Sequence, residues 1–134
     1  MESTEQAVIE EVSKVATRLG GGFPLWLQER RTPEFRTVEK GETGPDLVLL
    51  HGLFGAMSNW EGVFPHLAEF SRAIALEFPI LSGHRSEVRV KALAAFTECF
   101  VRTRCLQPVT LCGNSLGGHV ALRMALASPG AVDC

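Results

Sequence analysis

The most constraining feature of the sequence is a set of three short, continuously apolar runs, "DLVLLHG", "RAIALEF" and "PVTLCG". Runs of this kind are typical of strands that are buried on both faces of a parallel sheet. A segment with helical spacing of apolar residues follows each run, so strands and helices alternate. Because such crossovers are right-handed and place helices on both faces, the sequence predicts the α/β class with a mostly parallel sheet.

The helices predicted between these strands differ in regularity. The segment "SNWEGVFPHLAEF" indicates a loose helix that Pro65 interrupts, whereas "VRVKALAAFTECFVRTRC" has a broad apolar stripe. The segment "GGHVALRMALAS" indicates a regular helix that stops before Pro129. Nearer the N-terminus, "LWLQERR" is interpreted as a short strand and "EFRTVEKG" as a half-exposed strand, because the latter alternates between apolar and polar residues.

Residues 1–20 indicate an amphipathic helix that precedes the sheet. Its apolar residues fall on one face of a helix with about 3.6 residues per turn. They are Val8, Val12, Val15 and Leu19. A run of three glycines then begins a connector. We therefore expect residues 1–22 to form an amphipathic helix and connector, and residues 23–134 to form the α/β domain.

A serine stands between glycines where the third strand gives way to its helix. The pentapeptide Gly113-Asn114-Ser115-Leu116-Gly117 matches the pattern G-x-S-x-G in the strand–turn–helix context that a nucleophilic serine requires. Glycine at Gly113 and Gly117 avoids collisions in a tight, strained turn. The N–H of Leu116, at the start of the helix, can bind a developing oxyanion. The alternative is an ordinary strand-to-helix turn.

A second feature lies upstream, in "LVLLHGLFG". His51 and Gly52 follow an apolar strand, where a serine hydrolase of this architecture builds the other half of its oxyanion hole. The N–H of Leu53, or less favourably that of Phe54, would donate to the same oxyanion as Leu116. The imidazole of His51 is interpreted as structural, holding the loop.

Together, "HGLFGAMSNWEGV" and "CGNSLGGHVAL" resemble the α/β-hydrolase fold family from about Phe35 to Cys134. The resemblance is strongest to small members with an HG-x oxyanion loop, such as carboxylesterases and carbon–carbon bond hydrolases. It implies that Ser115 is the nucleophile and that Leu53 and Leu116 supply the N–H groups of the oxyanion hole. Phe54 and Trp60 are candidates to line an acyl pocket, although packing is the favoured role for Trp60.

The base and acid that activate such a serine are missing from their expected places. In this fold the order is serine, then Asp or Glu, then His. After Ser115 the chain has only His119, one turn into the helix, and Asp133, near its end. His66 is interpreted as solvated and His84 as a loop residue. The sequence therefore reads as an incomplete hydrolase whose His and Asp are expected beyond Cys134, and the chain alone is expected to be inactive.

Three functions remain open at this stage. The first is a serine hydrolase that cleaves an ester or related acyl bond of a small apolar substrate. The second is a truncated, non-catalytic binding or regulatory product that associates through its unfinished sheet edge. The third is a carbon–carbon bond hydrolase in the full-length form.

The composition of the chain argues against some classes of binding partner. The chain has 134 residues, about one domain, with a formal net charge of -2 and no charged block, which argues against nucleic acid or an anionic membrane as main partner. No apolar run approaches the ~20 residues that span a bilayer. The four cysteines have neither CxxC nor zinc spacing, which indicates reduced thiols in a cytoplasmic protein and no metal. No phosphate-binding loop is present in the sequence, so no cofactor is expected.

Overall fold

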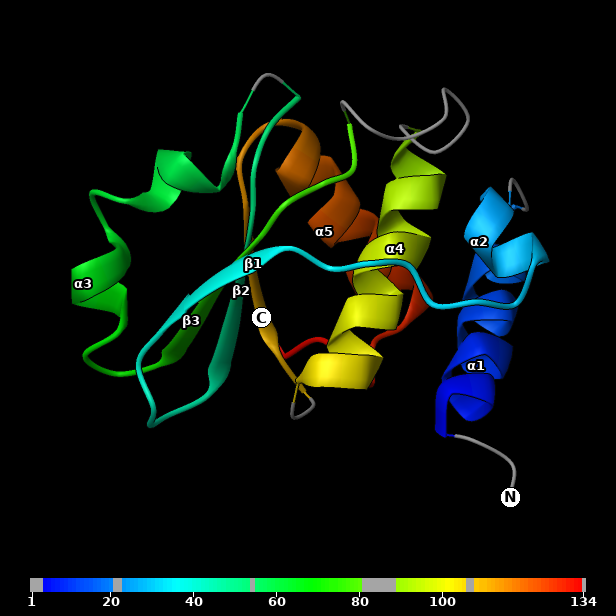
Figure 1. The fold of residues 1–134 in the computed structure, drawn as a ribbon, viewed down its shortest axis with the longest axis horizontal. Helices are drawn as coiled ribbons and strands as arrows, with labels where there is room; N and C mark the ends of the chain where they lie inside the picture. The colour runs from blue at the N-terminus through cyan, green and yellow to red at the C-terminus, as the bar shows by residue number, and fades with distance from the viewer. Residues whose placement is uncertain (1–3, 21–22, 54, 81–88, 106–107, 134) are drawn as a thin grey trace.

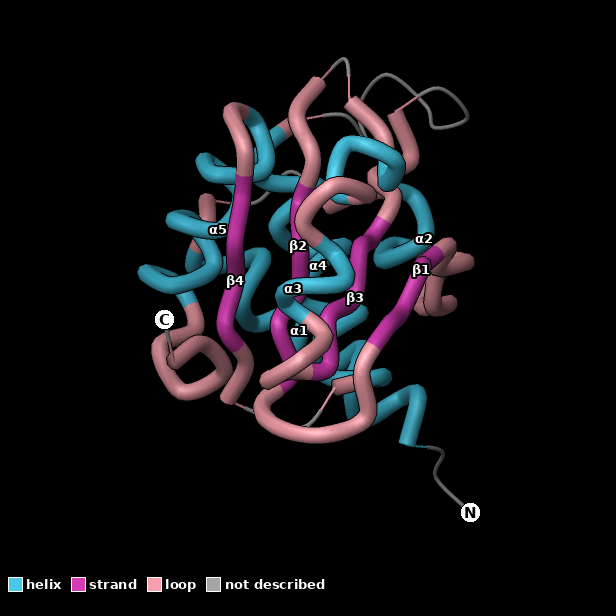
Figure 2. The backbone as a smooth tube through the Cα atoms, turned by 90° about the vertical axis from the view of Figure 1, so that its left-hand side faces the viewer, coloured by secondary structure: helices cyan, strands magenta, loops and turns pink. Residues whose placement is uncertain are grey.

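The computed structural model describes residues 4–20, 23–53, 55–80, 89–105 and 108–133. Within them, one sheet has the strand order β1-β3-β2-β4 (Figure 2). The central strand β2 pairs in parallel with β3 and β4, and β1 pairs with β3 in the antiparallel sense. The predicted mostly parallel sheet is thus confirmed. The strand bounds are β1 (Thr37–Lys40), β2 (Asp46–Leu50), β3 (Arg72–Leu76) and β4 (Thr110–Gly113).

Helices cover both faces of this sheet, as predicted. On one face lie the long helices α4 (Val90–Arg104) and α5 (Leu116–Ala127), over a core that includes Val48, Leu50 and Ile74. On the other face lie the short helices η1 (Met57–Trp60) and α3 (Phe64–Leu67), over Leu47, Leu49 and Ala75. Alternate residues of each strand point to opposite faces, so a continuously apolar strand serves both cores.

The N-terminal helix α1 (Thr4–Arg18) forms an outer layer. It packs on the side of α4 that faces away from the sheet, so α4 lies between α1 and the strands (Figure 1). The apolar face predicted from the sequence is buried there, with Val12 and Val15 fully enclosed. The short helix α2 (Leu25–Gln28) closes this layer by burying Leu27 beside α1.

Two local predictions are wrong. The segment "LWLQERR" is not a strand, because Pro24 precedes Leu25 in an extended conformation and the chain turns there into α2. Its Leu27 is buried by helical rather than strand geometry. Pro65 does not interrupt a helix but stands in the first turn of α3, where its missing N–H leaves no helical hydrogen bond unmade.

The strand β4 lies at an edge of the sheet. After α5 the chain returns to the start of β4, where Val132 forms a parallel bridge with Val109. The Val109 N–H donates to Ala131 O at 2.9 Å, and the Asp133 N–H donates to Val109 O at 2.8 Å. Residues next to the C-terminus thus pair with the chain at the start of β4.

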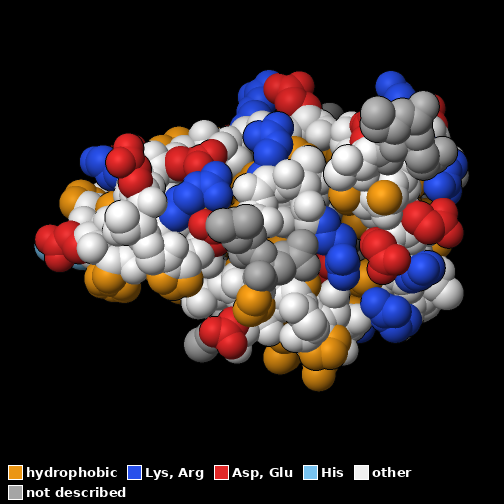
Figure 3. All heavy atoms as spheres, turned by 90° about the horizontal axis from the view of Figure 1, so that it is seen from below, with side chains coloured by type: hydrophobic (Ala, Val, Ile, Leu, Met, Phe, Trp, Pro, Cys, Tyr) orange, Lys and Arg blue, Asp and Glu red, His pale blue; other side chains and the backbone are white. Residues whose placement is uncertain are grey.

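Charges of both signs are mixed on the surface. The face seen in Figure 3 has Lys, Arg, Asp and Glu side chains interspersed, without a large region of one sign. This matches the expectation from the net charge of -2. None of the described helices is long and apolar enough to cross a membrane.

Candidate active site

Ser115 occupies a sharp turn between β4 and α5. Its backbone has φ 56° and ψ −114°, a conformation that costs a residue with a side chain about 1–3 kcal/mol. Hydrogen bonds hold the turn on both sides, because the Asn114 N–H donates to Leu50 O at 3.0 Å and the Gly117 N–H donates to Asn114 O at 3.0 Å. The turn leaves Ser115 exposed at the carboxyl end of the sheet.

The glycines on either side of Ser115 are required by close backbone contacts. A Cβ atom on Gly113 would lie 2.3 Å from the carbonyl carbon of Gly117, and one on Gly117 would lie 2.1 Å from Leu50 O. Real Cβ atoms do not approach backbone atoms so closely. The spacing of the motif therefore allows α5 to start directly against the end of β2.

Leu116 is the first residue of α5. The first N–H groups of a helix have no partner within the helix, and the helix dipole makes this end attractive to negative charge. The N–H of Leu116 is thus of a kind that can stabilise an oxyanion next to Ser115. No side chain caps this helix end.

The loop after β2 lies beside the serine turn. Since Leu50 of β2 pairs with Gly113 of β4, both loops leave the same edge of the sheet. A Cβ atom on Gly52 would lie 3.4 Å from Ser115 Cβ and 4.0 Å from Ser115 Oγ. Gly52 and Ser115 therefore face each other. Leu53, the next residue, is 44% exposed.

His51 is buried beneath this loop, at 2% exposure. Its Nε2 accepts a hydrogen bond of 2.9 Å from the Phe78 N–H. A backbone N–H can only donate, so Nε2 bears no proton and the neutral ring carries its proton on Nδ1. Nδ1 then donates to Gly52 O at 2.7 Å. With both nitrogens engaged, the imidazole is held rigidly and does not face solvent.

Of the two candidate pocket residues, Phe54 lies outside the described residues. Trp60 is half-buried and packs against the apolar cluster on the α3 face of the sheet. Its indole Nε1 is buried and has no hydrogen-bond partner among the described residues. A role for Trp60 in substrate binding stays a prediction.

Within the described part of the chain, no imidazole or carboxylate is hydrogen-bonded to Ser115 Oγ. His119 lies in α5, where its N–H donates to Ser115 O at 3.1 Å as an ordinary helical bond. His66 is exposed on α3, and Asp133 is exposed next to the bridge with β4. His84 lies outside the described residues. The described residues also include no group of His, Cys, Asp and Glu suited to a metal ion.

Two of the cysteines, Cys99 and Cys105, are not activated thiols. Cys99, Cys105 and Cys112 are unbridged. Burial raises the pKa of Cys99 to about 11. Burial, with a smaller contribution from the negative charge of Asp46, raises the pKa of Cys105 to about 12. Thiols with such values stay protonated near neutral pH and are poor nucleophiles.

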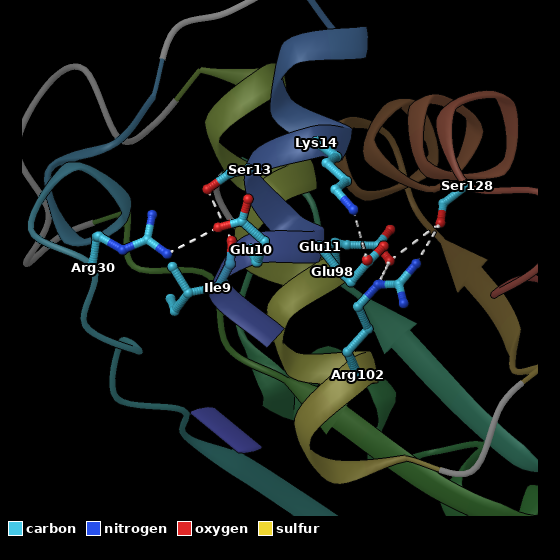
Figure 4. Close-up of polar contacts among 9 residues, drawn as sticks. All are labelled: Ile9, Glu10, Glu11, Ser13, Lys14, Arg30, Glu98, Arg102 and Ser128. Carbon is cyan, nitrogen blue, oxygen red and sulfur yellow. Dashed lines mark hydrogen bonds and ion pairs between the residues drawn. The ribbon is translucent and has the colours of Figure 1, made fainter. Parts of the chain in front are cut away.

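Sequence reasoning missed a buried polar cluster that joins α4 to the end of α5. Glu98 is fully buried and pairs with Arg102, and Ser128 Oγ donates to Glu98 Oε2 at 3.2 Å (Figure 4). Arg102 also donates to Ser128 Oγ at 3.2 Å. The i, i+4 spacing of Glu98 and Arg102 was the available signal. The cluster fixes the end of α5 opposite to Ser115.

Known proteins are similar to this chain in sequence. The profile of the alpha/beta hydrolase family matches residues 47–133. A pimeloyl-[acyl-carrier protein] methyl ester esterase of Nitrosomonas europaea is 35% identical over 94 residues, which are 69% of this chain and 36% of that protein. A 2-hydroxy-6-oxononadienedioate/2-hydroxy-6-oxononatrienedioate hydrolase of Dechloromonas aromatica is 29% identical over 130 residues, covering 79% of this chain and 44% of that protein.

A solved structure is also similar to this chain, in both fold and sequence. An alpha/beta hydrolase enzyme from the metagenome of sediments of the Mar Chica lagoon superposes with a TM-score of 0.68 and 37% sequence identity. The match covers 75% of this chain and 46% of that one. This chain thus spans less than half the length of these relatives. From the match over residues 47–133 and the shared fold, we conclude that the chain belongs to the α/β-hydrolase family.

Proposed function

We propose that this chain carries the nucleophile and oxyanion hole of a serine hydrolase, with Ser115 as the nucleophile. The observation that carries this proposal is the strained φ of 56° at Ser115, in a turn that its glycine neighbours alone permit. Residues with such backbone strain are concentrated at active sites. The strained turn places the Ser115 hydroxyl between the end of β4 and the start of α5.

The Leu53 and Leu116 N–H groups are the proposed oxyanion donors. They come from two loops that leave paired strands at the same edge, and Gly52 faces Ser115 across the gap. Two donors on one oxygen would stabilise the tetrahedral intermediate, and loss of one typically lowers kcat about 100- to 1,000-fold. Gly52, Gly113 and Gly117 are proposed to serve the backbone geometry, and His51 to hold the loop.

In the proposed reaction, Ser115 Oγ attacks the carbonyl carbon of an ester while its proton passes to an imidazole. That imidazole then protonates the leaving alcohol, and water releases the acyl group by the same route in reverse. We place the imidazole and its orienting carboxylate after Cys134. Leu53 has an exposed apolar side chain and follows Gly52, which faces Ser115, so the proposed substrate carries a small apolar acyl group.

Two other functions each have one observation in their favour. The similarity to the Dechloromonas aromatica hydrolase supports carbon–carbon bond hydrolysis by the same site. The exposed edge of β4 supports a non-catalytic product that binds a partner there. A cytoplasmic location remains a prediction from the spacing of the cysteines in the sequence.

The first test is to read the native transcript beyond the Cys134 codon and to label its product with a serine-directed phosphonate. We expect an open frame that encodes an acid and then a histidine, and labelling that is lost in Ser115→Ala. Circular dichroism of both proteins controls for folding. A stop codon directly after Cys134, or a folded product that resists labelling, would contradict the catalytic function and favour the binding product. Substrate profiling then separates ester from carbon–carbon bond hydrolysis.

A further inference from the structure

The carbonyl oxygen of Gly52 accepts two hydrogen bonds. One comes from His51 Nδ1 at 2.7 Å, and the other comes from the Gly55 N–H at 3.0 Å. Both Gly52 and the His51 ring are buried, so water does not compete freely for this oxygen. A carbonyl oxygen has two lone pairs, and here both are used. The direction of the Gly52 carbonyl is therefore fixed.

The Gly52 carbonyl and the Leu53 N–H belong to one planar peptide unit. In a trans peptide the two bonds point in opposite directions. Fixing the carbonyl toward His51 and Gly55 therefore also fixes the N–H, which must point away from both. We propose that His51 is a positioning residue that sets the direction of the Leu53 N–H. This inference rests on the proposed function, in which that N–H is an oxyanion donor.

The other nitrogen of His51 anchors the ring to the neighbouring strand. Phe78 is 3% exposed, follows β3 closely, and donates its N–H to Nε2 at 2.9 Å. The His51 and Phe78 rings also pack together, with centroids 5.0 Å apart. The orientation of the imidazole is thus determined by the end of β3. His51 transmits that orientation to the Gly52–Leu53 peptide, which a hydrogen bond from Gly55 alone would leave free to tilt.

Two substitutions separate the two hydrogen bonds of His51. The amide nitrogen of Asn takes the place of Nδ1, so His51→Asn can still donate to Gly52 O but loses the bond from Phe78. The amide oxygen of Gln takes the place of Nε2, so His51→Gln keeps the bond from Phe78 but loses the one to Gly52. His66→Gln, at an exposed position on α3, is the matched control.

The readout is the residual dipolar coupling of the Leu53 N–H, which reports the direction of that bond, measured in the protein that the native transcript encodes. We expect the coupling to change in His51→Gln and to stay native in His51→Asn and His66→Gln. Thermal unfolding is measured beside it. Equal changes in His51→Asn and His51→Gln, following their loss of Tm, would show a merely structural role and overturn the inference. An unchanged coupling in both would also overturn it.

A measurement on the native protein keeps the inference testable if the variants do not fold. In nitrogen-15 spectra of the neutral His51 ring, we expect the proton on Nδ1, and a proton on Nε2 would overturn the inference. The phosphonate labelling rate of Ser115 should fall about 100-fold in His51→Gln and far less in His51→Asn. If Ser115 of the native protein is not labelled, the proposed function fails, whereas the dipolar coupling still decides the role of His51.

Discussion

At the residue scale, Gly117 is under a sharp steric constraint. A Cβ atom there would lie 2.1 Å from Leu50 O and 2.8 Å from His51 O, both backbone atoms that cannot move without shifting β2. We expect Gly117→Ala to lower the free energy of unfolding by about 1–3 kcal/mol or more, measured by urea denaturation. It should also abolish labelling of Ser115, because α5 must move away from the end of β2.

The matched control is Gly130→Ala. No heavy atom lies within 4 Å of a Cβ atom at Gly130, so this substitution should change the unfolding free energy little. A similar loss of stability in both variants would mean that the close approach of α5 to β2 does not explain the glycine at Gly117.

Glu98 gives a prediction for pH. Burial raises the pKa of its carboxyl above the ordinary value of 4.5, and the opposing effects of Arg102 and Ser128 are smaller. Folding therefore favours the protonated form of Glu98 relative to the unfolded chain. The contribution of Glu98 to the stability of the folded protein is fully present below pH 4.5 and is lost as the pH rises through the raised pKa.

The variant Glu98→Gln isolates this contribution because Gln does not titrate. Relative to the native protein, Glu98→Gln should become progressively more stable as the pH rises from 4.5 through the raised pKa. Unfolding free energies of both proteins, measured across this range, give the difference directly. A difference that does not vary with pH would contradict the raised pKa.

The sequence predicted the serine turn better than it predicted Glu98. The turn is local, so the spacing of Gly113, Ser115 and Gly117 alone specifies it. Burial of Glu98 depends instead on where α1 and the end of α5 pack, which no local pattern encodes. The same holds for His51, whose place in the motif was visible but whose bond from Phe78 joins residues that are distant in the chain.

At the scale of elements, α4 is buried on more sides than its apolar stripe predicted. The pattern predicted one apolar face, yet every residue from Ala92 to Val101 is buried. The sheet covers one side of α4 and α1 covers another, in an apolar cluster that includes Ile9, Ala95 and Cys99. The spacing of apolar residues in α1 predicted a helix with one apolar face. It did not predict the surface against which that face packs.

This packing predicts that α1 contributes substantially to stability. Ile9 is fully buried, so Ile9→Ala should lower the unfolding free energy by about 2–5 kcal/mol. Lys14→Ala on the exposed side of α1 removes only a surface ion pair with Glu11 and should cost less than about 1 kcal/mol. Urea denaturation of both variants tests the difference. Equal, small effects would mean that α1 does not belong to the cooperative unit.

At the scale of the whole molecule, one side of β4 has no neighbouring strand within the sheet that the described residues form. The Asn114 N–H is bonded to Leu50 of β2, whereas the Val109 N–H faces the other way, toward Ala131. Since peptide groups alternate along a strand, the Leu111 N–H faces the same open side as that of Val109. The helix α5 that follows β4 also exposes Leu122 by 60% and Leu126 by 75%. A strand with an unpaired edge favours pairing with another chain.

We therefore expect this chain to associate with increasing concentration, and Leu111→Pro to weaken the association. Proline removes the N–H that faces the open side, whereas the bonds from β4 to β2 use the neighbouring residues. Thr110→Pro is the contrasting variant, because its N–H faces β2 and its loss should instead lower stability. Sedimentation velocity over a range of concentrations, with urea denaturation of each variant, measures both effects. If Leu111→Pro associates as the native chain does while remaining folded, the edge of β4 is not the contact, and the exposed leucines of α5 become the surface to substitute next.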